Sequence, residues 1–247
     1  SSACGCLNQL FEKRPDFLMQ RTRHRPVPSG RVSSRQAFIF GFYLGVAGLI
    51  LLGSQVNALA CFLASVAIVL YLLAYTPLKL KTPLSAWFGA VAGAMPPLIG
   101  WASARGSLEA PAWVLFAIQF LWQIPHFLAL FWMHRKDYEN AGFRVLSVVD
   151  PEGSLTALQI ALHSFAVLLA SLAPVFMGWA GLSYGVAAMV AVIVFLVLGL
   201  KASWTLSAHD MRRLFLGSLV YLPVLLGMLI VGSWPEQARL EAHQLAQ

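Results

Sequence analysis

Long apolar runs separated by short polar segments dominate the pattern of the chain. The runs cover approximately residues 37–53, 57–75, 84–104, 111–133, 155–178, 182–200 and 214–234. A bilayer core about 30 Å thick needs roughly 20 apolar residues for one helical crossing. Residues 187–200 lack the polar stripe of a water-facing helix, and the runs are too long and too uniform for barrel strands. The pattern predicts an all-α fold, a polytopic bundle of seven transmembrane helices in a single domain over residues 1–247.

The composition is that of a membrane protein. Hydrophobic residues make up 59% of the 247 residues and charged residues only 11%, whereas a typical globular domain is about a quarter charged. A water-facing surface cannot be built from so few polar groups at this length. The balance argues against a soluble enzyme, a disordered chain and a nucleic-acid binder. The three cysteines, Cys4, Cys6 and Cys61, are interpreted as small apolar residues that form neither a disulfide framework nor a metal site.

The basic residues predict how the bundle is oriented. The chain has 17 Lys and Arg against 10 Asp and Glu, a net charge of +7. Most of the basic residues gather in four segments on one side of the predicted bundle: residues 13–36, 79–81, 135–144 and 201–213. Only Arg105 and Arg239 fall on the other side. Because basic loops stay on the cytoplasmic side of a membrane, we expect an integral protein of a bacterial inner membrane, with the basic face in the cytoplasm and the C-terminus outside.

One polar segment offers ligands for a metal ion. Asn8, Glu12 and Asp16 are spaced four residues apart, which on a helix places an amide and two carboxylates along one face. Mg²⁺ prefers such hard oxygen ligands and usually bridges one or two carboxylates to substrate phosphates. Pro15 works against this geometry, because it removes a backbone donor and disfavours helix at Arg14. A solvated helix end with ordinary polar residues is the alternative interpretation of the spacing.

Basic side chains follow this acidic segment. Arg21 and Arg25 belong to an arginine-rich stretch just after Asp16, and Lys79 and Lys81 lie in the next segment on the same face. A cytoplasmic loop needs no further function to explain its arginines. A cluster of guanidinium groups beside two carboxylates is also what a diphosphate with its magnesium requires, because the metal neutralises some oxygens and arginine binds others in pairs. Charge alone leaves both interpretations open.

Prolines and a histidine within the apolar runs hint at an internal site. Pro96 and Pro97 interrupt the third run, and Pro125 interrupts the fourth beside His126. Broken backbone at membrane depth is tolerated where it is buried or lines a wet cavity, and a histidine there needs a partner or a cavity. Kinks without function and a hydrogen-bonded structural histidine are the alternatives. For His163 the structural interpretation is the stronger one, because nothing around it resembles a site.

Four ordered blocks within about residues 3–153 form a more specific pattern. They are Asn8-x3-Glu12-x3-Asp16 with Arg21 and Arg25-Pro26, Tyr75-Thr76 with Lys79, Gly93-Ala94-x-Pro96-Pro97, and Pro125-His126-Phe127 with Asp137-Tyr138 and Val148-Val149-Asp150. The set resembles the UbiA superfamily of intramembrane prenyltransferases, in its protoheme IX farnesyltransferase branch. The double-proline and histidine blocks distinguish this branch from its quinone-forming relatives.

The resemblance implies an enzyme that transfers the farnesyl group of farnesyl diphosphate to a vinyl group of heme B. The product would be heme O, which is used by terminal oxidases, so that heme A synthase or a terminal oxidase assembly is an expected partner beside the lipid bilayer. Mg²⁺ is the implied cofactor, whereas heme B is a substrate. The implied metal ligands are Asn8, Glu12, Asp16 and Asp137.

The resemblance also implies roles for basic and aromatic residues. The implied diphosphate-binding residues are Arg21, Arg25, Lys79 and Lys81. His126 and Tyr138 would belong to the heme pocket, and His126 joins the four metal ligands as a catalytic residue. Leu80 stands where the family usually has an arginine, for which Lys81 would compensate.

This sequence departs from the family pattern in further ways. Glu12 occupies a position where the superfamily often has Asp, and Arg14 one where many relatives have another acid. The family has nine spans, and we expect seven here plus the tail of another over residues 1–7. The first span and most of the second are therefore expected to be absent from this sequence.

Three other functions are compatible with parts of the pattern. The nearest is a related prenyltransferase that acts on a quinone precursor or a chlorin. A membrane transporter is another, because broken helices and intramembrane histidines also mark substrate pathways, although the charged motifs here lie on one face and not at the midplane. The third is an inactive relative with a heme-binding role.

Overall fold

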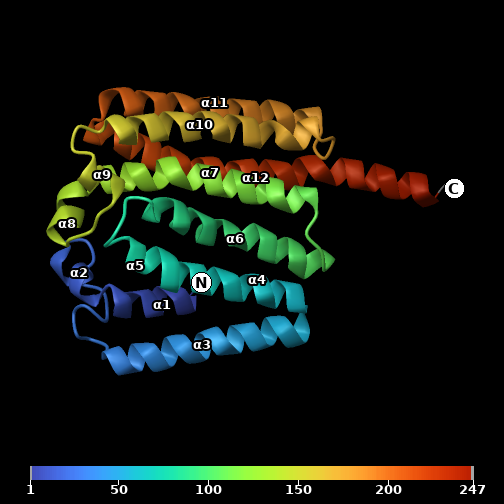
Figure 1. Ribbon diagram of the computed structural model, residues 1–247. Helices are drawn as coiled ribbons and strands as arrows, with labels where there is room; N and C mark the ends of the chain where they lie inside the picture. Colours follow the sequence, from blue (N-terminus) through green and yellow to red (C-terminus); the bar gives the residue numbers. More distant parts are fainter. Residues whose placement is uncertain (1, 246–247) are drawn as a thin grey trace.

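The computed structural model describes the backbone of residues 2–245 and the side chains of residues 2–232, and within this range all regular structure is helical (Figure 1). The helices are α1 (Ser2–Phe11), α2 (Lys13–Leu18), α3 (Ser34–Gln55), α4 (Ala58–Val69), the π-helical turn η1 (Leu70–Tyr75), α5 (Thr76–Leu78), α6 (Ser85–Arg105), α7 (Ala110–Met133), α8 (Arg135–Asn140), α9 (Leu146–Val149), α10 (Ser154–Phe176), α11 (Leu182–Thr205) and α12 (Ala208–Leu245). The predicted all-α fold is confirmed.

Six helical segments are long and apolar enough to cross a membrane. They are Ser34–Gln55, Ala58–Leu78, Ala110–Met133, Ser154–Phe176, Leu182–Thr205 and Ala208–Gly232. The third predicted run also folds as one long helix, α6, but small and weakly hydrophobic residues make up much of it. These small residues are buried, Ala86, Ala90 and Ala94 completely so, because α6 lies between α4 and α7. Its modest hydropathy reflects an inner position in the bundle, where close packing matters more than contact with lipid.

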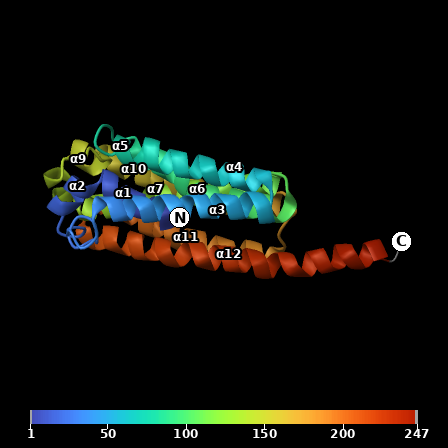
Figure 2. The same ribbon diagram turned by 90° about the horizontal axis from the view of Figure 1, so that it is seen from below.

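The long helices form two groups that meet at α6 and α7. In the first group α1 packs on α3, α3 on α4, and α4 on α6; in the second α7 packs on α10 and α12, and α11 on both of these. All of them run along one axis, as the two perpendicular views show (Figures 1 and 2). Large apolar side chains cover the outside, Phe40 being 63% and Val220 64% exposed. Such a surface fits a lipid solvent.

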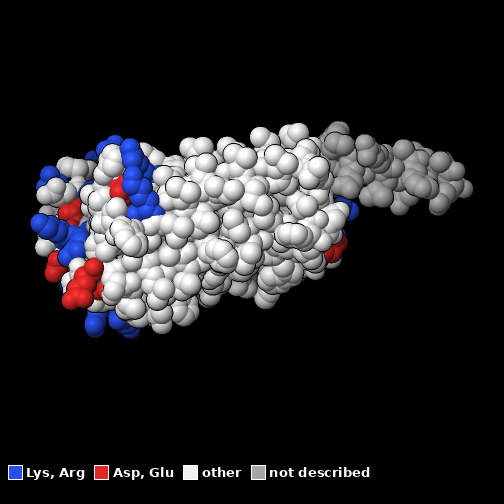
Figure 3. Space-filling view, turned by 90° about the horizontal axis from the view of Figure 1, so that it is seen from above, with Lys and Arg blue, Asp and Glu red and all other residues white. Residues whose placement is uncertain are grey.

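Charged side chains gather at one end of this cylinder (Figure 3). The same end carries the short helices α2, α8 and α9 and the loops beside them (Figure 1). The loop at the opposite end contributes Arg105 and Glu109, while the side chain of Arg239 lies outside the described residues. The uneven distribution of basic residues in the sequence therefore corresponds to two ends of the bundle, one rich in charge and one where the described side chains carry little charge.

The expected interruptions at the prolines are wrong. Both α6 and α7 continue as helices through Pro96, Pro97 and Pro125. The break in regular helix occurs instead between α4 and α5, where the backbone N–H of Thr76 bonds to the carbonyl of Tyr71, five residues earlier. Such π-helical turns are rare and occur frequently at functional sites. Each internal proline lacks the backbone N–H that would donate one helical hydrogen bond. Packing against neighbouring helices compensates for this loss in a membrane bundle.

Close approach of α10 and α11 depends on a glycine. A Cβ atom built on Gly199 would lie 2.9 Å from Cβ of Ser164 and closer still to its hydroxyl oxygen. Both residues are in the buried interface between the two helices. Small residues at such positions allow transmembrane helices to pack through direct van der Waals contact.

We expect Gly199→Ala to destabilise the bundle by about 1–3 kcal/mol, because the added methyl group overpacks this interface. Gly100→Ala is the matched control, since a Cβ atom at Gly100 meets nothing within 4 Å. Thermal unfolding of both variants in detergent micelles checks the expectation. Equal midpoints for the two variants would contradict the packing role given to Gly199.

Candidate functional site

The acidic residues near the start of the chain share one buried face. Asn8, Glu12 and Asp16 are 5%, 4% and 2% exposed. Regular helix breaks at Glu12, because Pro15 has no N–H for the carbonyl of Phe11. The backbone N–H of Glu12 still bonds to Asn8 at 2.9 Å, and that of Asp16 to Glu12 at 2.7 Å. The four-residue register therefore survives the break, and the three side chains line the same cavity.

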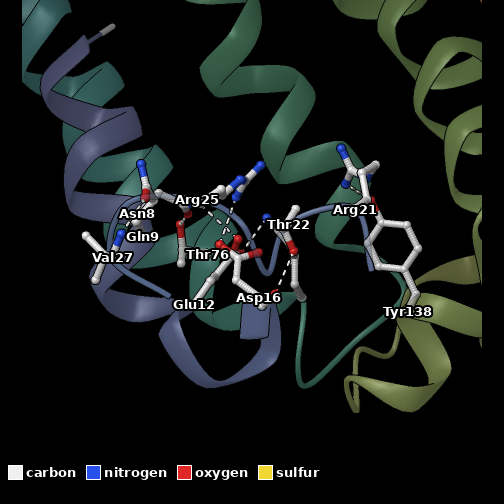
Figure 4. Close-up of polar contacts among 11 residues, drawn as sticks. Asn8, Gln9, Glu12, Asp16, Arg21, Thr22, Arg25, Val27, Thr76 and Tyr138 are labelled. Carbon is white, nitrogen blue, oxygen red and sulfur yellow. Dashed lines mark hydrogen bonds and ion pairs between the residues drawn. The ribbon is translucent and has the colours of Figure 1, made fainter. Parts of the chain in front are cut away.

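Each carboxylate of this face is paired with a cation, and Figure 4 shows Arg25 beside Asp16. Lys79 Nζ lies 2.5 Å from Glu12 Oε1, and the Arg25 guanidinium donates to Asp16 Oδ2 at 2.8 Å. The Asn8 amide nitrogen donates to the other Glu12 oxygen at 2.8 Å. Buried charges persist only when they are paired and hydrogen-bonded, and these contacts meet that requirement.

The π-helical turn places a second group of side chains over the acidic face. The Thr76 hydroxyl lies 2.8 Å from Asn8 Oδ1 and 2.8 Å from the Tyr71 carbonyl. Lys79 follows three residues later, with Nζ 4.4 Å from the centre of the Tyr75 ring. The chain thus forms a continuous polar row from Thr76 through Asn8 and Glu12 to Lys79.

The loop after α2 closes the cavity from the polar end. Arg21 donates to the Tyr138 hydroxyl at 3.2 Å (Figure 4), which links this loop to α8. Tyr138 is buried, with its ring in edge-to-face contact with those of Phe131 and Phe143. Burial raises the pKa of the Tyr138 hydroxyl, while the Arg21 guanidinium opposes the shift. The phenol therefore stays protonated at neutral pH and retains a hydrogen to donate.

These residues surround a cavity of about 150 Å³ at the charged end of the bundle. Its polar lining contains seven of the residues predicted from the sequence: Asn8, Glu12, Asp16, Arg21, Arg25, Lys79 and Tyr138. Met19, Phe127, Leu130, Phe131 and Phe143 line the apolar side, together with Tyr71 and Tyr75. The cavity therefore combines charges of both signs with an apolar wall.

Three predicted site residues lie elsewhere. Lys81 is exposed, and Asp137 is half-buried at the start of α8; neither lines the cavity. His126 lies on α7, where its Nδ1 is 2.7 Å from the Ser218 hydroxyl and its ring stacks between Trp122 and Phe215. These contacts give the intramembrane histidine the polar partner that it needs.

His163 also finds a partner close by. Its Nδ1 lies 2.9 Å from the Gln159 carbonyl on the preceding turn of α10. The structural interpretation of His163 agrees with this contact.

Several cavity residues are not among those expected from the sequence, namely Tyr71 and the apolar wall residues Phe131 and Phe143. The recurrence of Tyr71, Tyr75 and Lys79 at four-residue intervals is a signal that could have suggested a second face. The apolar wall carries no such signal, because aromatic residues in an apolar run resemble lipid-facing ones.

The oxygen atoms of the cavity fit a hard divalent cation that has further ligands from a substrate or from water. Glu12 Oε1 is buried without a hydrogen-bond donor apart from its ion-pair contact with Lys79. Two carboxylates and an amide are oxygen ligands of the kind that Mg²⁺ takes beside phosphate oxygens. Within the described residues, however, no three His, Cys, Asp or Glu side chains are grouped closely enough to hold a metal alone. The remaining ligands must come from a substrate or from water.

A second, larger hollow adjoins this cavity. It has a volume of about 530 Å³ and lies among α1, α3, α4 and α6, with Tyr71 in the lining of both spaces. Its walls are mostly alanine, glycine and leucine residues. The hollow is therefore apolar, and Tyr71 lies between it and the charged cavity as a shared lining residue.

Comparisons with known proteins agree with this architecture. A solved structure described as digeranylgeranylglyceryl phosphate synthase has a TM-score of 0.73 at 18% identity, and the match covers 94% of this chain and 80% of that chain. At this identity the likeness shows the fold alone.

Sequence relatives are more similar. The chain is 40% identical over 231 residues to a protein named protoheme IX farnesyltransferase from Solibacter usitatus, covering 94% of this chain and 79% of that protein. It is 41% identical over 236 residues to a protein of the same name from Sorangium cellulosum, covering 94% and 83%. Residues 1–234 match the model of the UbiA prenyltransferase family. Nearly the whole chain is thus accounted for, and it belongs to the UbiA prenyltransferase family.

Proposed function

We propose that this enzyme transfers the farnesyl group of farnesyl diphosphate to a vinyl group of heme B, producing heme O. The observation that carries the proposal is the buried cavity in which two carboxylates meet Arg21, Arg25 and Lys79 beside an aromatic wall. This combination suits a diphosphate attached to an apolar chain. The names of relatives about 40% identical support farnesyl diphosphate and protoheme IX as the two substrates.

The polar lining would bind the diphosphate head. Arg21, Arg25 and Lys79 offer donors to its oxygens, and guanidinium groups can bind two oxygens at once. Glu12 and Asp16, with Asn8 beside them, would hold Mg²⁺. When bound, this ion neutralises charge on the leaving diphosphate. Arg21, Arg25 and Lys79 would stabilise the same developing negative charge through hydrogen bonds to the diphosphate oxygens.

The aromatic wall would protect the reaction from water. When the bond between C1 of farnesyl and the diphosphate oxygen breaks, diphosphate leaves with the electron pair and an allylic cation remains. The vinyl group of heme attacks C1, water adds to the resulting cation on the porphyrin side, and one proton is released to give the hydroxyethyl group. Phe127, Phe131 and Phe143 line the apolar side of the cavity, where exclusion of bulk water prevents quenching of the first cation.

The heme acceptor would lie along α7. Tyr138 lines the cavity directly. His126 precedes the cavity residue Leu130 by one helical turn, a rise of about 6 Å, so that a porphyrin on this side of the cavity would contact both His126 and Tyr138. We propose the heme-pocket role of these two residues on that basis, with heme A synthase or a terminal oxidase as the recipient of the product.

The charged end of the bundle would face the cytoplasm of a bacterial cell. The apolar helices are those of an integral membrane protein, and the loops at the charged end carry most of the lysine and arginine residues. Since basic loops remain on the cytoplasmic side, the cavity would open toward the inner face of the cytoplasmic membrane and α12 would lead outward.

We expect membranes containing the protein to convert heme B and farnesyl diphosphate to heme O only when Mg²⁺ is present. Asp16→Ala should lower the rate by about 100-fold or more, the range for losing one charge-stabilising group at a reaction centre. Glu152→Gln removes an exposed carboxylate outside the cavity and should leave the rate unchanged. Chromatography of extracted hemes measures the product; undiminished heme O from Asp16→Ala, or none from the unmodified protein, would refute the proposal.

Orientation can be tested with two serine positions that are both exposed. Ser29 lies in the arginine-rich loop and Ser107 in the loop between α6 and α7. In a variant whose three cysteines are replaced by alanine, Ser107→Cys should react with a membrane-impermeant maleimide in intact cells. Ser29→Cys should react only after the membrane is permeabilised, and the reverse pattern would place the cavity on the outer side.

A further inference from the structure

Both carboxylates of the cavity are already neutralised by the chain itself. Glu12 is paired with Lys79, whose side chain is only 10% exposed, and Asp16 is paired with Arg25, whose side chain is 36% exposed. The contact distances are 2.5 Å and 2.8 Å. A metal ion that binds these carboxylates must therefore displace or share a resident cation.

The charges of the lining favour certain ligands over others. Glu12 and Asp16 contribute two negative charges, while Arg21, Arg25 and Lys79 contribute three positive ones, so the lining carries a net charge of +1. A divalent cation alone would raise this to about +3, and a diphosphate ester with about three negative charges would lower it to about −2. One of each together brings the lining to about neutral. Glu12, Asp16 and Lys79 are buried, whereas Arg21 is exposed, and uncompensated charge on the buried groups is costly.

Ligand number points in the same direction. Mg²⁺ requires near-octahedral coordination by oxygen, and within the described residues the cavity supplies only two carboxylates and the Asn8 amide. The amide oxygen already accepts from Thr76. A cation that enters by itself would be poorly coordinated, whereas one that enters with a diphosphate brings further oxygen ligands.

Lys79 has a second set of contacts that does not depend on Glu12. Its ammonium group lies 4.4 Å from the centre of the Tyr75 ring and 5.8 Å from that of Phe143. Cation–π contacts of this kind are favourable in desolvated sites. If a metal ion replaces Lys79 as the partner of Glu12, Lys79 can remain in the cavity against these rings. Its flexible side chain can then turn toward a diphosphate oxygen.

We propose that Lys79 and Arg25 are resident counter-ions that exclude a lone divalent cation, so that cation and diphosphate bind as a coupled pair. In the metal-free protein they neutralise Glu12 and Asp16, and in the loaded protein they pair with the diphosphate. The proposal rests on the proposed function for the presence of a diphosphate in this cavity, but it requires neither farnesyl nor heme.

The coupling can be measured in the purified protein with Mn²⁺ and inorganic pyrophosphate as probes. Electron paramagnetic resonance reports free Mn²⁺ and gives its dissociation constant with and without saturating pyrophosphate. We expect pyrophosphate to tighten Mn²⁺ binding by about tenfold or more, and Mn²⁺ to tighten pyrophosphate binding by the same factor, because coupling free energies are reciprocal. Isothermal titration calorimetry measures the effect of Mn²⁺ on pyrophosphate binding independently. A titration of Mn²⁺ with pyrophosphate in the absence of protein corrects for the complex that the two form in solution.

Lys79→Met should change this pattern in a specific direction. Without its counter-ion, Glu12 attracts Mn²⁺ directly, so binding of Mn²⁺ alone should tighten by about tenfold while the coupling factor shrinks. Arg25→Gln should likewise tighten binding of Mn²⁺ alone, here at Asp16. The fold should tolerate this replacement better than that of Lys79, since Arg25 is partly exposed. Lys136→Met is the matched control: it removes the same charge from an exposed position outside the cavity and should leave both affinities unchanged.

Two results would overturn the proposal. Binding of Mn²⁺ to the unmodified protein with equal affinity in the presence and absence of pyrophosphate would remove the coupling and leave the proposed function intact. Weaker or unchanged binding of Mn²⁺ alone by both Lys79→Met and Arg25→Gln, with helical content preserved, would show that these cations do not compete with the metal. Absence of heme O formation in the activity assay, by contrast, would not alter either measurement.

Discussion

The need to keep several charges paired within an apolar bundle governs this end of the molecule. Glu12 and Asp16 are almost completely buried, and each is stable there only because a cation reaches it from another part of the chain. Lys79 comes from the segment after the π-helical turn, and Arg25 from the loop after α2. The two ion pairs therefore join three separate segments of the chain. The shape of the cavity follows from where these pairs must meet.

The rest of the fold positions those segments. α6 carries few large residues, and this allows α4 and α7 to lie close on either side of it. The π-helical turn then brings Tyr75 and Thr76 over the acidic face, with a Cβ atom at Gly89 only 2.6 Å from the Tyr75 ring. A larger residue at that position would push the ring into the cavity. Packing at the centre of the membrane and electrostatics at its edge are thus parts of one arrangement.

Much of the architecture follows from the sequence, because membrane helices and loop charges obey strong and simple constraints. The face of Asn8, Glu12 and Asp16 could be predicted since the four-residue register continues through the break. The local geometry of the basic segment could not be predicted: Lys79 and Lys81 are alike in charge and only two residues apart, yet only Lys79 lines the cavity. The prediction of helix breaks at the prolines is wrong because neighbouring helices can support a helix that contains proline. The π-helical turn that does occur, Leu70–Tyr75, contains no proline to reveal it in the sequence.

The π-helical turn lets this membrane-spanning segment vary in length. One extra residue in an α-helix rotates everything after it by about 100° around the helix axis. Leu70–Tyr75 accommodates such an extra residue and still passes the helix on to Thr76 and Lys79. In genetic terms, the wide turn can absorb the gain of a single codon in this span, so that Thr76 and Lys79 still face the cavity. The length of the helix can thus change by one residue without a change in the residues that line the cavity.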